Sequence, residues 1–164
     1  MNSTTGILST AILIGSGGAA LIDLWSLALR RAFHVTTLDY ALLGRWIGHF
    51  RSGRFLHTRI AAAPRVRGER FLGWTAHYAI GVGFALVLLA LFGTDWAGSP
   101  TIVPALLVGL GSIAAPWFIM QPAFGAGIAG SRTANPAASR LRNLGTHTVY
   151  GLGLYLSAVL LSAF

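Results

Sequence analysis

Four long apolar stretches determine what this chain can fold into. A helix that crosses a bilayer needs about 20 predominantly apolar residues, and four stretches reach that length: residues 7–29, 72–92, 102–124 and 144–164. Only 10% of the residues are charged, against about 25% in a soluble domain. The sequence therefore predicts an all-α, polytopic membrane protein, a bundle of four transmembrane helices forming a single domain over residues 1–164.

The positions of the arginines predict which side of the membrane each loop faces. All twelve basic residues are arginines; nine lie between residues 30 and 70 and three between residues 132 and 142. Positively charged residues stay on the cytoplasmic side, so the segments 30–71 and 125–143 are expected there. Both termini are then expected on the opposite, outer side of the membrane. This topology accounts for the net charge of +8 without nucleic acid, and the bilayer with its anionic lipid headgroups is the expected partner.

The stretch LDYALLGRWIGHF (38–50) predicts a short amphipathic helix in the first of these segments. Apolar residues recur at helical spacing: Leu42, Leu43, Trp46, Ile47 and Phe50. The side chains expected to face water are Arg45, His49, Arg51 and Arg54. Such a helix can lie on the inner leaflet or pack against the base of the bundle, and the sequence leaves both arrangements open.

A spacing of histidine and glycine occurs twice. His77 precedes Gly81 and Gly83 in the second span, and the same pattern recurs in the fourth span, 70 residues later, as His147, Gly151 and Gly153. A repeat of this kind predicts two tandem helical hairpins. Independently of any repeat, small residues let membrane helices approach closely, so close packing is the simplest role for these glycines.

Four polar or ionisable side chains interrupt the apolar stretches, one in each. They are Asp23, His77, Gln121 and His147. Because such groups are costly in hydrocarbon, they mark functional sites by default. Counted along ideal helices, all four lie roughly 4–9 Å inside the cytoplasmic boundary. The sequence therefore predicts a polar chamber at one depth, near the cytoplasmic face.

Two prolines and three arginines complete the predicted chamber. Pro116 and Pro122 flank Gln121, and each proline removes a backbone hydrogen bond and kinks the third span. Carbonyl groups freed in this way must line a cavity or be buried in protein. Three arginines are candidates for the mouth of the chamber: Arg45, Arg70 and Arg132.

Three functions are compatible with such a chamber. In the first, it binds or conducts a small solute or a proton, since imidazole titrates near neutral pH. In the second, His77 and His147 ligate haem b or a metal ion; apart from that pair, no cofactor or metal is predicted. In the third, the polar groups only fix the register of the helices, and the protein is a structural or accessory membrane subunit.

An enzymatic role is the least favoured. The sequence has no cysteine, no serine in a nucleophile turn, no close pair of carboxylates and no metalloprotease motif. The glycine-lined helix faces would allow a homodimer or a second membrane protein to pack against this one. The sequence does not choose between these partners.

Several segments resemble one family of bacterial membrane proteins. They are LDYALLGRWIGHFRSGRF, AAAPRVRGERFLGWTAHYAIG, PALLVGLG, MQPAFGAGIAGSRTANPAASRLRNLGTH and GLGLYL. Together they are similar to the family catalogued as domain of unknown function 2938, and the resemblance covers nearly all of the chain from Asp23 onward. It implies a compact multi-span protein of the bacterial inner membrane. It implies no activity and transfers no site residues.

Overall fold

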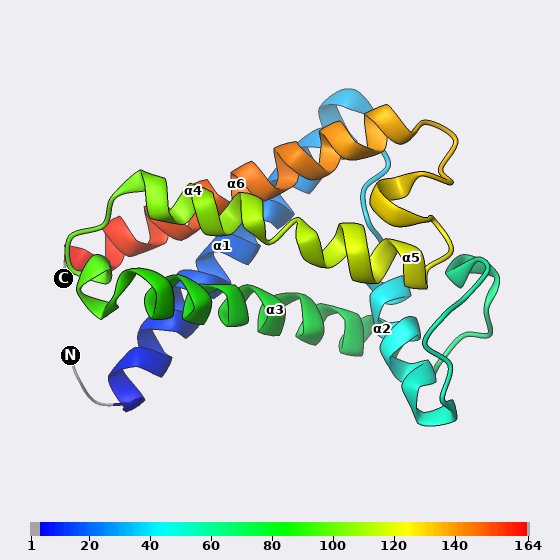
Figure 1. Cartoon of the computed structure of the whole chain (residues 1–164), viewed down its shortest axis with the longest axis horizontal. Coiled ribbons are helices and arrows are strands. Elements are labelled where there is room, and N and C mark those ends of the chain that lie inside the picture. The colour runs from blue at the N-terminus through cyan, green and yellow to red at the C-terminus, as the bar shows by residue number, and fades with distance from the viewer. Residues whose placement is uncertain (1–3, 164) are drawn as a thin grey trace. The chain divides into compact units, whose positions relative to one another are not determined.

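The computed structural model describes residues 4–163, and helices dominate this part of the chain. The α-helices are α1 (Thr4–Phe33), α2 (Tyr40–His49), α3 (Glu69–Phe92), α4 (Ile102–Gly111), α5 (Gln121–Ala123) and α6 (Pro136–Ser162) (Figure 1). A π-helical segment, Pro116–Met120, precedes α5. Short 3-10 turns are Phe50–Ser52, Ile60–Ala62, Thr94–Ala97 and Ile128–Gly130. Residues 4–163 contain no β-strand.

Four helical segments are long and apolar enough to cross a membrane. They are Thr4–Phe33, Glu69–Phe92, Ile102–Ala123 and Pro136–Ser162. Each has an 18-residue window of high mean hydropathy, from 1.3 to 2.0. The prediction of an all-α protein with four potential membrane spans is confirmed.

The fourth helix begins earlier than the apolar stretch: α6 starts at Pro136, within the segment 125–143 whose cytoplasmic placement stays a prediction. Asn135 precedes the helix and accepts the N–H of Ala138 at 3.0 Å. Pro136 follows in the first turn. N–H groups of a first turn have no intrahelical acceptor, so proline, which lacks an N–H, is tolerated there. Hydropathy does not register this start because the first two turns are polar. Arg140 and Arg142, which precede the fourth apolar stretch, therefore lie in α6.

The amphipathic stretch 38–50 does form a helix, α2, capped by Asp39, which accepts the N–H of Ala41 at 2.9 Å. Its polar face differs from the prediction. Arg45 and His49 were expected to face water, but they are only 6% and 8% exposed. That prediction is wrong because both side chains have partners far along the sequence, described below. The placement of α2 on a leaflet stays a prediction.

The described chain forms two compact units. The first contains Met1–Thr36, Tyr78–Ser112 and Gly145–Phe164, and the second contains Thr37–His77 and Ile113–Leu144. Ten arginines and two acidic residues fall in the second unit and give it a net charge of +8. Two arginines and two aspartates leave the first unit neutral. The sequence did not indicate this division, and the single-domain assignment stays a prediction.

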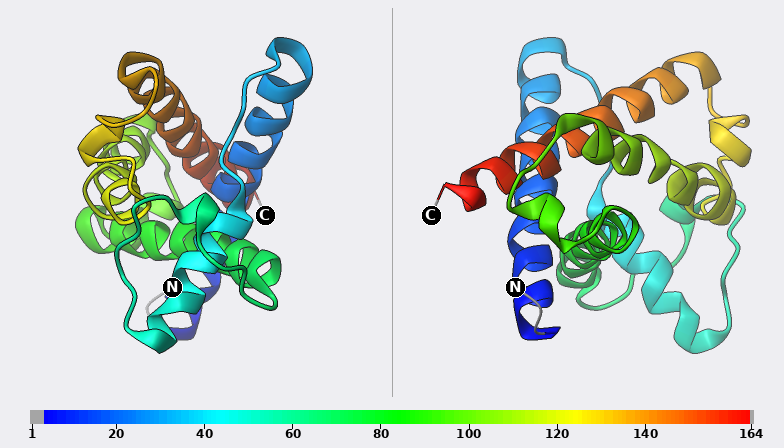
Figure 2. Two further views of the ribbon diagram at one scale, coloured as in Figure 1. Left: turned by 90° about the vertical axis from the view of Figure 1, so that its right-hand side faces the viewer. Right: turned by 60° about the vertical axis from the view of Figure 1, so that its left-hand side comes forward.

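The first unit has an apolar core shared by its helices. Its fully buried members include Ala11, Ile14, Ala85, Leu88, Ala105, Leu154 and Ala158. Within this unit α1 and α6 cross closely (Figure 2). A Cβ atom added at Gly153 of α6 would lie 2.8 Å from Cα of Gly18 in α1, so glycine is required for this approach of the two backbones.

Glycines also join the helices within each predicted hairpin. A Cβ atom at Gly15 of α1 would lie 2.7 Å from the carbonyl oxygen of Gly81 in α3. A Cβ atom at Gly109 of α4 would lie 2.5 Å from Cα of Gly151 in α6. The α1–α3 and α4–α6 pairs thus make the same kind of glycine contact, which is what two tandem hairpins require.

Candidate functional site

A hydrogen bond joins α1 to α3 within the first unit. The phenolic O–H of Tyr78 donates to Oδ2 of Asp23 at 2.9 Å. A carboxylate among apolar helices is costly unless it is hydrogen-bonded. Asp23 is one of the four predicted chamber residues. Tyr78 was not predicted, because a tyrosine within an apolar stretch is not distinguished from the other residues of the span.

A second polar pair joins α4 to α6 in the same unit. Oγ of Ser112 donates to the carbonyl oxygen of Gly109 at 2.6 Å and lies 2.7 Å from Nδ1 of His147. A hydroxyl has one proton, so the imidazole must donate through Nδ1 if the hydroxyl proton goes to the carbonyl. His147 then carries its proton on Nδ1 and presents Nε2 as an acceptor.

A third interhelical bond connects α6 to α3. The hydroxyl of Tyr150, a residue only 3% exposed, donates to the carbonyl oxygen of Gly81 at 2.6 Å. Tyr150 lies three residues after His147, and Gly81 lies three residues after Tyr78, so each pair shares a helix face. This bond therefore lies about one turn away from the polar pairs along both helices.

Four of these side chains lie at one distance from the ends of their own helices: Asp23, Tyr78, Ser112 and His147, here called the polar layer. Asp23 is ten residues before the end of α1, and Tyr78 is nine residues after the start of α3. Ser112 and His147 are each eleven residues from the matching ends of their spans. Along an unbroken α-helix, at 1.5 Å per residue, these separations correspond to about 14–17 Å. These distances are counted from the ends of the helices, whereas the predicted 4–9 Å is counted from the ends of the apolar stretches, so that depth stays a prediction.

The third span is interrupted next to the polar layer. α4 ends at Gly111, Ser112 and Ile113 form a turn, and a π-helical segment begins at Pro116. Pro116 has no N–H to offer the carbonyl four residues earlier. Pro122 lies in the first turn of α5. The broken backbone thus places the hydroxyl of Ser112 at the end of α4, where it bonds both a carbonyl and an imidazole.

The other two predicted chamber residues belong to the second unit. The ring of His77 stacks on Tyr40 with centroids 4.1 Å apart, and Trp74 meets it edge-on at 6.0 Å. Oε1 of Gln121 is buried and has no hydrogen-bond partner among residues 4–163. The structure therefore brings Asp23 and His147 into one unit and His77 and Gln121 into the other. A chamber formed by all four stays a prediction.

Arg45 is part of a buried ion pair in the second unit. Its Nε and Nη2 atoms donate to the two carboxylate oxygens of Glu69, each at 2.8 Å, and Nη1 donates to backbone carbonyls of Ile60, Ala61 and Ala63. The hydrogen bonds to Glu69 raise the pKa of Arg45 above its ordinary value, although burial opposes them. All hydrogen bonds of the Arg45 guanidinium described here are therefore made to residues of the second unit.

The other two arginines proposed for the mouth are exposed. Arg70 lies in the first turn of α3, and Arg132 follows the turn Ile128–Gly130. No contact described here involves either guanidinium. Their role at a mouth stays a prediction.

A pair of histidines also lies in the second unit, and the sequence analysis missed it. Nδ1 of His49 and Nε2 of His57 are 2.8 Å apart, and Nε2 of His49 lies 3.1 Å from the carbonyl oxygen of Pro64. If His49 donates to that carbonyl, its Nδ1 must accept from His57. Nδ1 of His57, which is buried and has no hydrogen-bond partner within residues 4–163, is then an acceptor. Burial, reinforced by His49 and Arg54, lowers the pKa of His57.

Sequence comparison places the chain in a family. The family model described as "Protein of unknown function (DUF2938)" matches residues 12–161. The chain belongs to this family. The match covers the second and third span-length helices whole, the first from residue 12 and the fourth up to residue 161, and it includes every residue of the polar layer. No curated protein and no solved structure matches the chain.

Membership of DUF2938 assigns no ligand to the chain. A ligand can therefore be proposed only from the chemistry of the side chains at the site. Within residues 4–163, no group of three or more histidine, cysteine, aspartate or glutamate side chains could hold a metal ion. Tyr78 and Ser112 were missed because each looks like an ordinary member of an apolar or small-residue run. Their positions along the helices could have identified them. Tyr78 lies about as far from the end of its span as Asp23 does, and Ser112 about as far as His147 does.

Proposed function

We propose that this membrane protein binds and passes protons, or a small polar solute, at its polar layer. The observation that carries the proposal is the layer itself. Each spanning helix contributes one polar side chain, and these are paired between helices as Asp23 with Tyr78 and Ser112 with His147. Polar groups at membrane depth mark ion and substrate pathways by default, and proton relays use acidic and histidine side chains.

A proton suits the chemistry of these groups. The carboxylate of Asp23 and Nε2 of His147 are acceptors, and the hydroxyls of Tyr78 and Ser112 can both donate and accept. The hydroxyl of Tyr150 lies a turn from His147 and is a further proton-carrying group between α6 and α3. The third span, which is interrupted at Ser112, is the segment that would move as the layer is loaded and emptied.

The same proposal includes a topology. The first unit is neutral, whereas the second carries the whole net charge of +8. By the positive-inside rule the second unit faces the cytoplasm, and both termini are periplasmic in a bacterial inner membrane. No nucleic acid is needed to explain the charge. A homodimer or a second membrane protein remains compatible with this topology.

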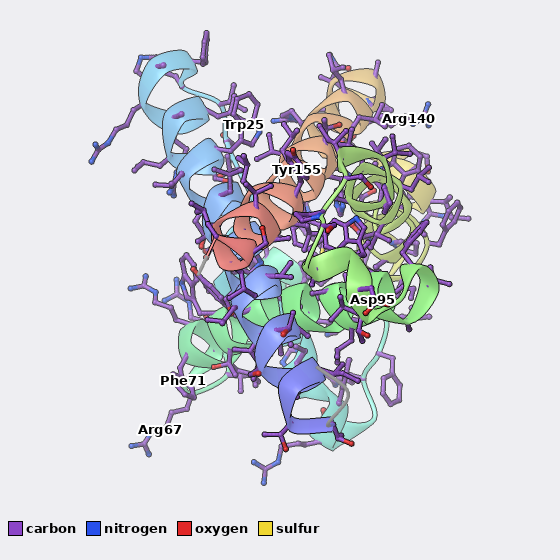
Figure 3. The ribbon with its side chains drawn as sticks, turned by 90° about the vertical axis from the view of Figure 1, so that its left-hand side faces the viewer. Trp25, Arg67, Phe71, Asp95, Arg140 and Tyr155 are labelled. Carbon is purple, nitrogen blue, oxygen red and sulfur yellow. The ribbon has the colours of Figure 1, made fainter. Side chains whose placement is uncertain are left out.

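Proton flux into liposomes tests the proposal. The protein is reconstituted into vesicles that enclose a pH-sensitive dye, and a membrane potential drives proton entry. Wild-type protein should conduct, and Asp23→Asn and His147→Gln should each remove most of the flux. Asp95→Asn is the matched control, because Asp95 is exposed in the turn after α3 (Figure 3). Equal flux in all four proteins, or no flux in the wild type, would contradict proton conduction.

One observation favours a second candidate, ligation of haem b or a metal ion. Histidine ligands of metals usually donate their other ring N–H to a fixed acceptor, and Nδ1 of His147 makes such a contact with Ser112. His77 would be the second ligand. The visible absorption spectrum of the purified protein tests this candidate. A haem band that disappears in His147→Ala and in His77→Ala would support it, and a colourless, metal-free protein would reject it.

A further inference from the structure

The loop that follows α2 carries large apolar side chains on its surface. Phe50, Phe55 and Leu56 are 37%, 56% and 77% exposed. Exposed apolar residues are common one at a time, but a group of them marks a contact surface. These three lie within seven residues of one another in the second unit, so they form one candidate surface.

Hydrogen bonds hold this loop in a defined shape. Nε1 of Trp46 donates to the carbonyl oxygen of Phe55 at 2.8 Å, and the N–H of Arg54 donates to the carbonyl oxygen of His49 at 3.2 Å. At the far end, the N–H of His57 donates to the carbonyl oxygen of Ala123 at 2.9 Å. The apolar side chains are therefore held at the surface by a fixed backbone.

Aromatic contacts support the same arrangement. The rings of Trp46 and Phe50 meet edge-on with centroids 4.8 Å apart, and those of Phe50 and Phe55 are 5.1 Å apart. Trp46 also meets Phe124 edge-on at 5.9 Å. The exposed rings of Phe50 and Phe55 thus extend an aromatic cluster that begins at the half-buried Trp46. Leu56 is the most exposed side chain of the surface.

The charges around the surface are all positive. Arg51, Arg54 and Arg59 are exposed within the same stretch. The two acidic residues of the second unit are already engaged, Asp39 as the cap of α2 and Glu69 with Arg45. The loop therefore offers three guanidinium groups that have no carboxylate nearby in the sequence.

We infer that this loop, residues 50–59, is a lipid-binding surface that inserts into a leaflet containing anionic phospholipids. Phenylalanine and leucine side chains enter the boundary between headgroups and acyl chains. Guanidinium groups bind phosphate oxygens through paired N–H donors, and basic residues near an anionic leaflet are attracted to it. The combination of an apolar tip and an arginine rim fits a lipid surface. This inference does not depend on proton binding by the polar layer.

A label on the outermost side chain tests the inference, because the chain has no cysteine of its own. Leu56→Cys carries a nitroxide, and Ala134→Cys, at another exposed position of the second unit, is the matched control. Full-length protein is placed in nanodiscs of phosphatidylcholine, with or without phosphatidylglycerol. Collisions with oxygen, which concentrates in lipid, are compared with collisions with a water-soluble nickel complex.

In the discs with phosphatidylglycerol, the label at 56 should collide more with oxygen than with nickel, and the label at 134 should show the reverse. Combining Arg51→Gln, Arg54→Gln and Arg59→Gln should return the label at 56 to water. A label at 56 that stays in water in both lipids overturns the inference. So does a label shielded from both reagents, which would indicate a protein partner. Equal insertion with and without the arginines overturns the requirement for anionic lipid.

Discussion

Replacing Glu69 by glutamine removes the charge that the buried Arg45 faces in the second unit. The guanidinium and carboxylate side chains are 7% and 14% exposed and are joined by two bonds of 2.8 Å. The same carboxylate accepts the N–H of Val66 at 3.0 Å, just before α3 begins. Removing one member of a buried pair leaves an uncompensated charge and costs about 3–5 kcal/mol. We expect Glu69→Gln to lower stability by this amount.

Thermal unfolding of the purified protein in detergent measures the effect. On the scaling of soluble chains of 150–250 residues, this loss is about 6–20 °C in Tm. Arg67→Gln is the matched control, because the side chain of Arg67 is exposed and points away from the ribbon (Figure 3). The double variant Arg45→Met with Glu69→Met leaves no lone charge. Its loss of stability should therefore be smaller than the sum of the losses in Arg45→Met and Glu69→Met alone. Equal melting of Glu69→Gln and Arg67→Gln would refute the pairing.

Three further predictions concern packing, hydrogen bonding and pH. Gly109→Val should lower stability by about 1–3 kcal/mol through overpacking. Gly83→Val is the control and should change stability little, because a Cβ at Gly83 meets no atom within 4 Å. Equal melting temperatures of the two variants would contradict the close contact of α4 with α6. Tyr150→Phe should lower the free energy of unfolding by about 0.5–1.5 kcal/mol, because one buried hydrogen bond to the carbonyl oxygen of Gly81 is lost, and unchanged melting would speak against this bond. Because the folded-state pKa of His57 is below the ordinary 6.5, the unfolded chain takes up the proton first. Stability should therefore fall as pH drops below about 6.5, by at most about 1.4 kcal/mol per pH unit, and His57→Gln should flatten that slope; an identical slope would exclude His57 as its source.

The sequence was sufficient for the helices and for their glycine contacts. Spans could be predicted because apolar length is a local property. Three of the four repeated glycines, Gly81, Gly151 and Gly153, do meet small residues of a neighbouring helix, whereas Gly83 meets none. The early start of α6 was missed because Ser139, Arg140, Arg142 and Asn143 keep the hydropathy of its first two turns low. The burial of Arg45 was missed for a different reason. Its acidic partner is 24 residues away, and helical periodicity carries no information about such pairs.

The candidate site could be predicted only in part, again for physical reasons. Asp23 and His147 stand out because charge or imidazole in an apolar stretch is rare. Their partners Tyr78 and Ser112 became visible only when the helices were paired, since a hydroxyl in a span is unremarkable until it faces an acceptor. His77 and Gln121 were predicted at the same depth from their distance to the ends of the apolar stretches. Both belong to the second unit, and their common depth with Asp23 and His147 stays a prediction.

Infrared difference spectroscopy of the reconstituted protein tests proton binding at the polar layer most directly. Spectra recorded before and after acidification report a protonated carboxyl group by its C=O stretching band. The proposal predicts such a band in the wild type and in Asp95→Asn, and its loss in Asp23→Asn. A band of the same size in Asp23→Asn, or no band in the wild type, would contradict proton uptake by Asp23.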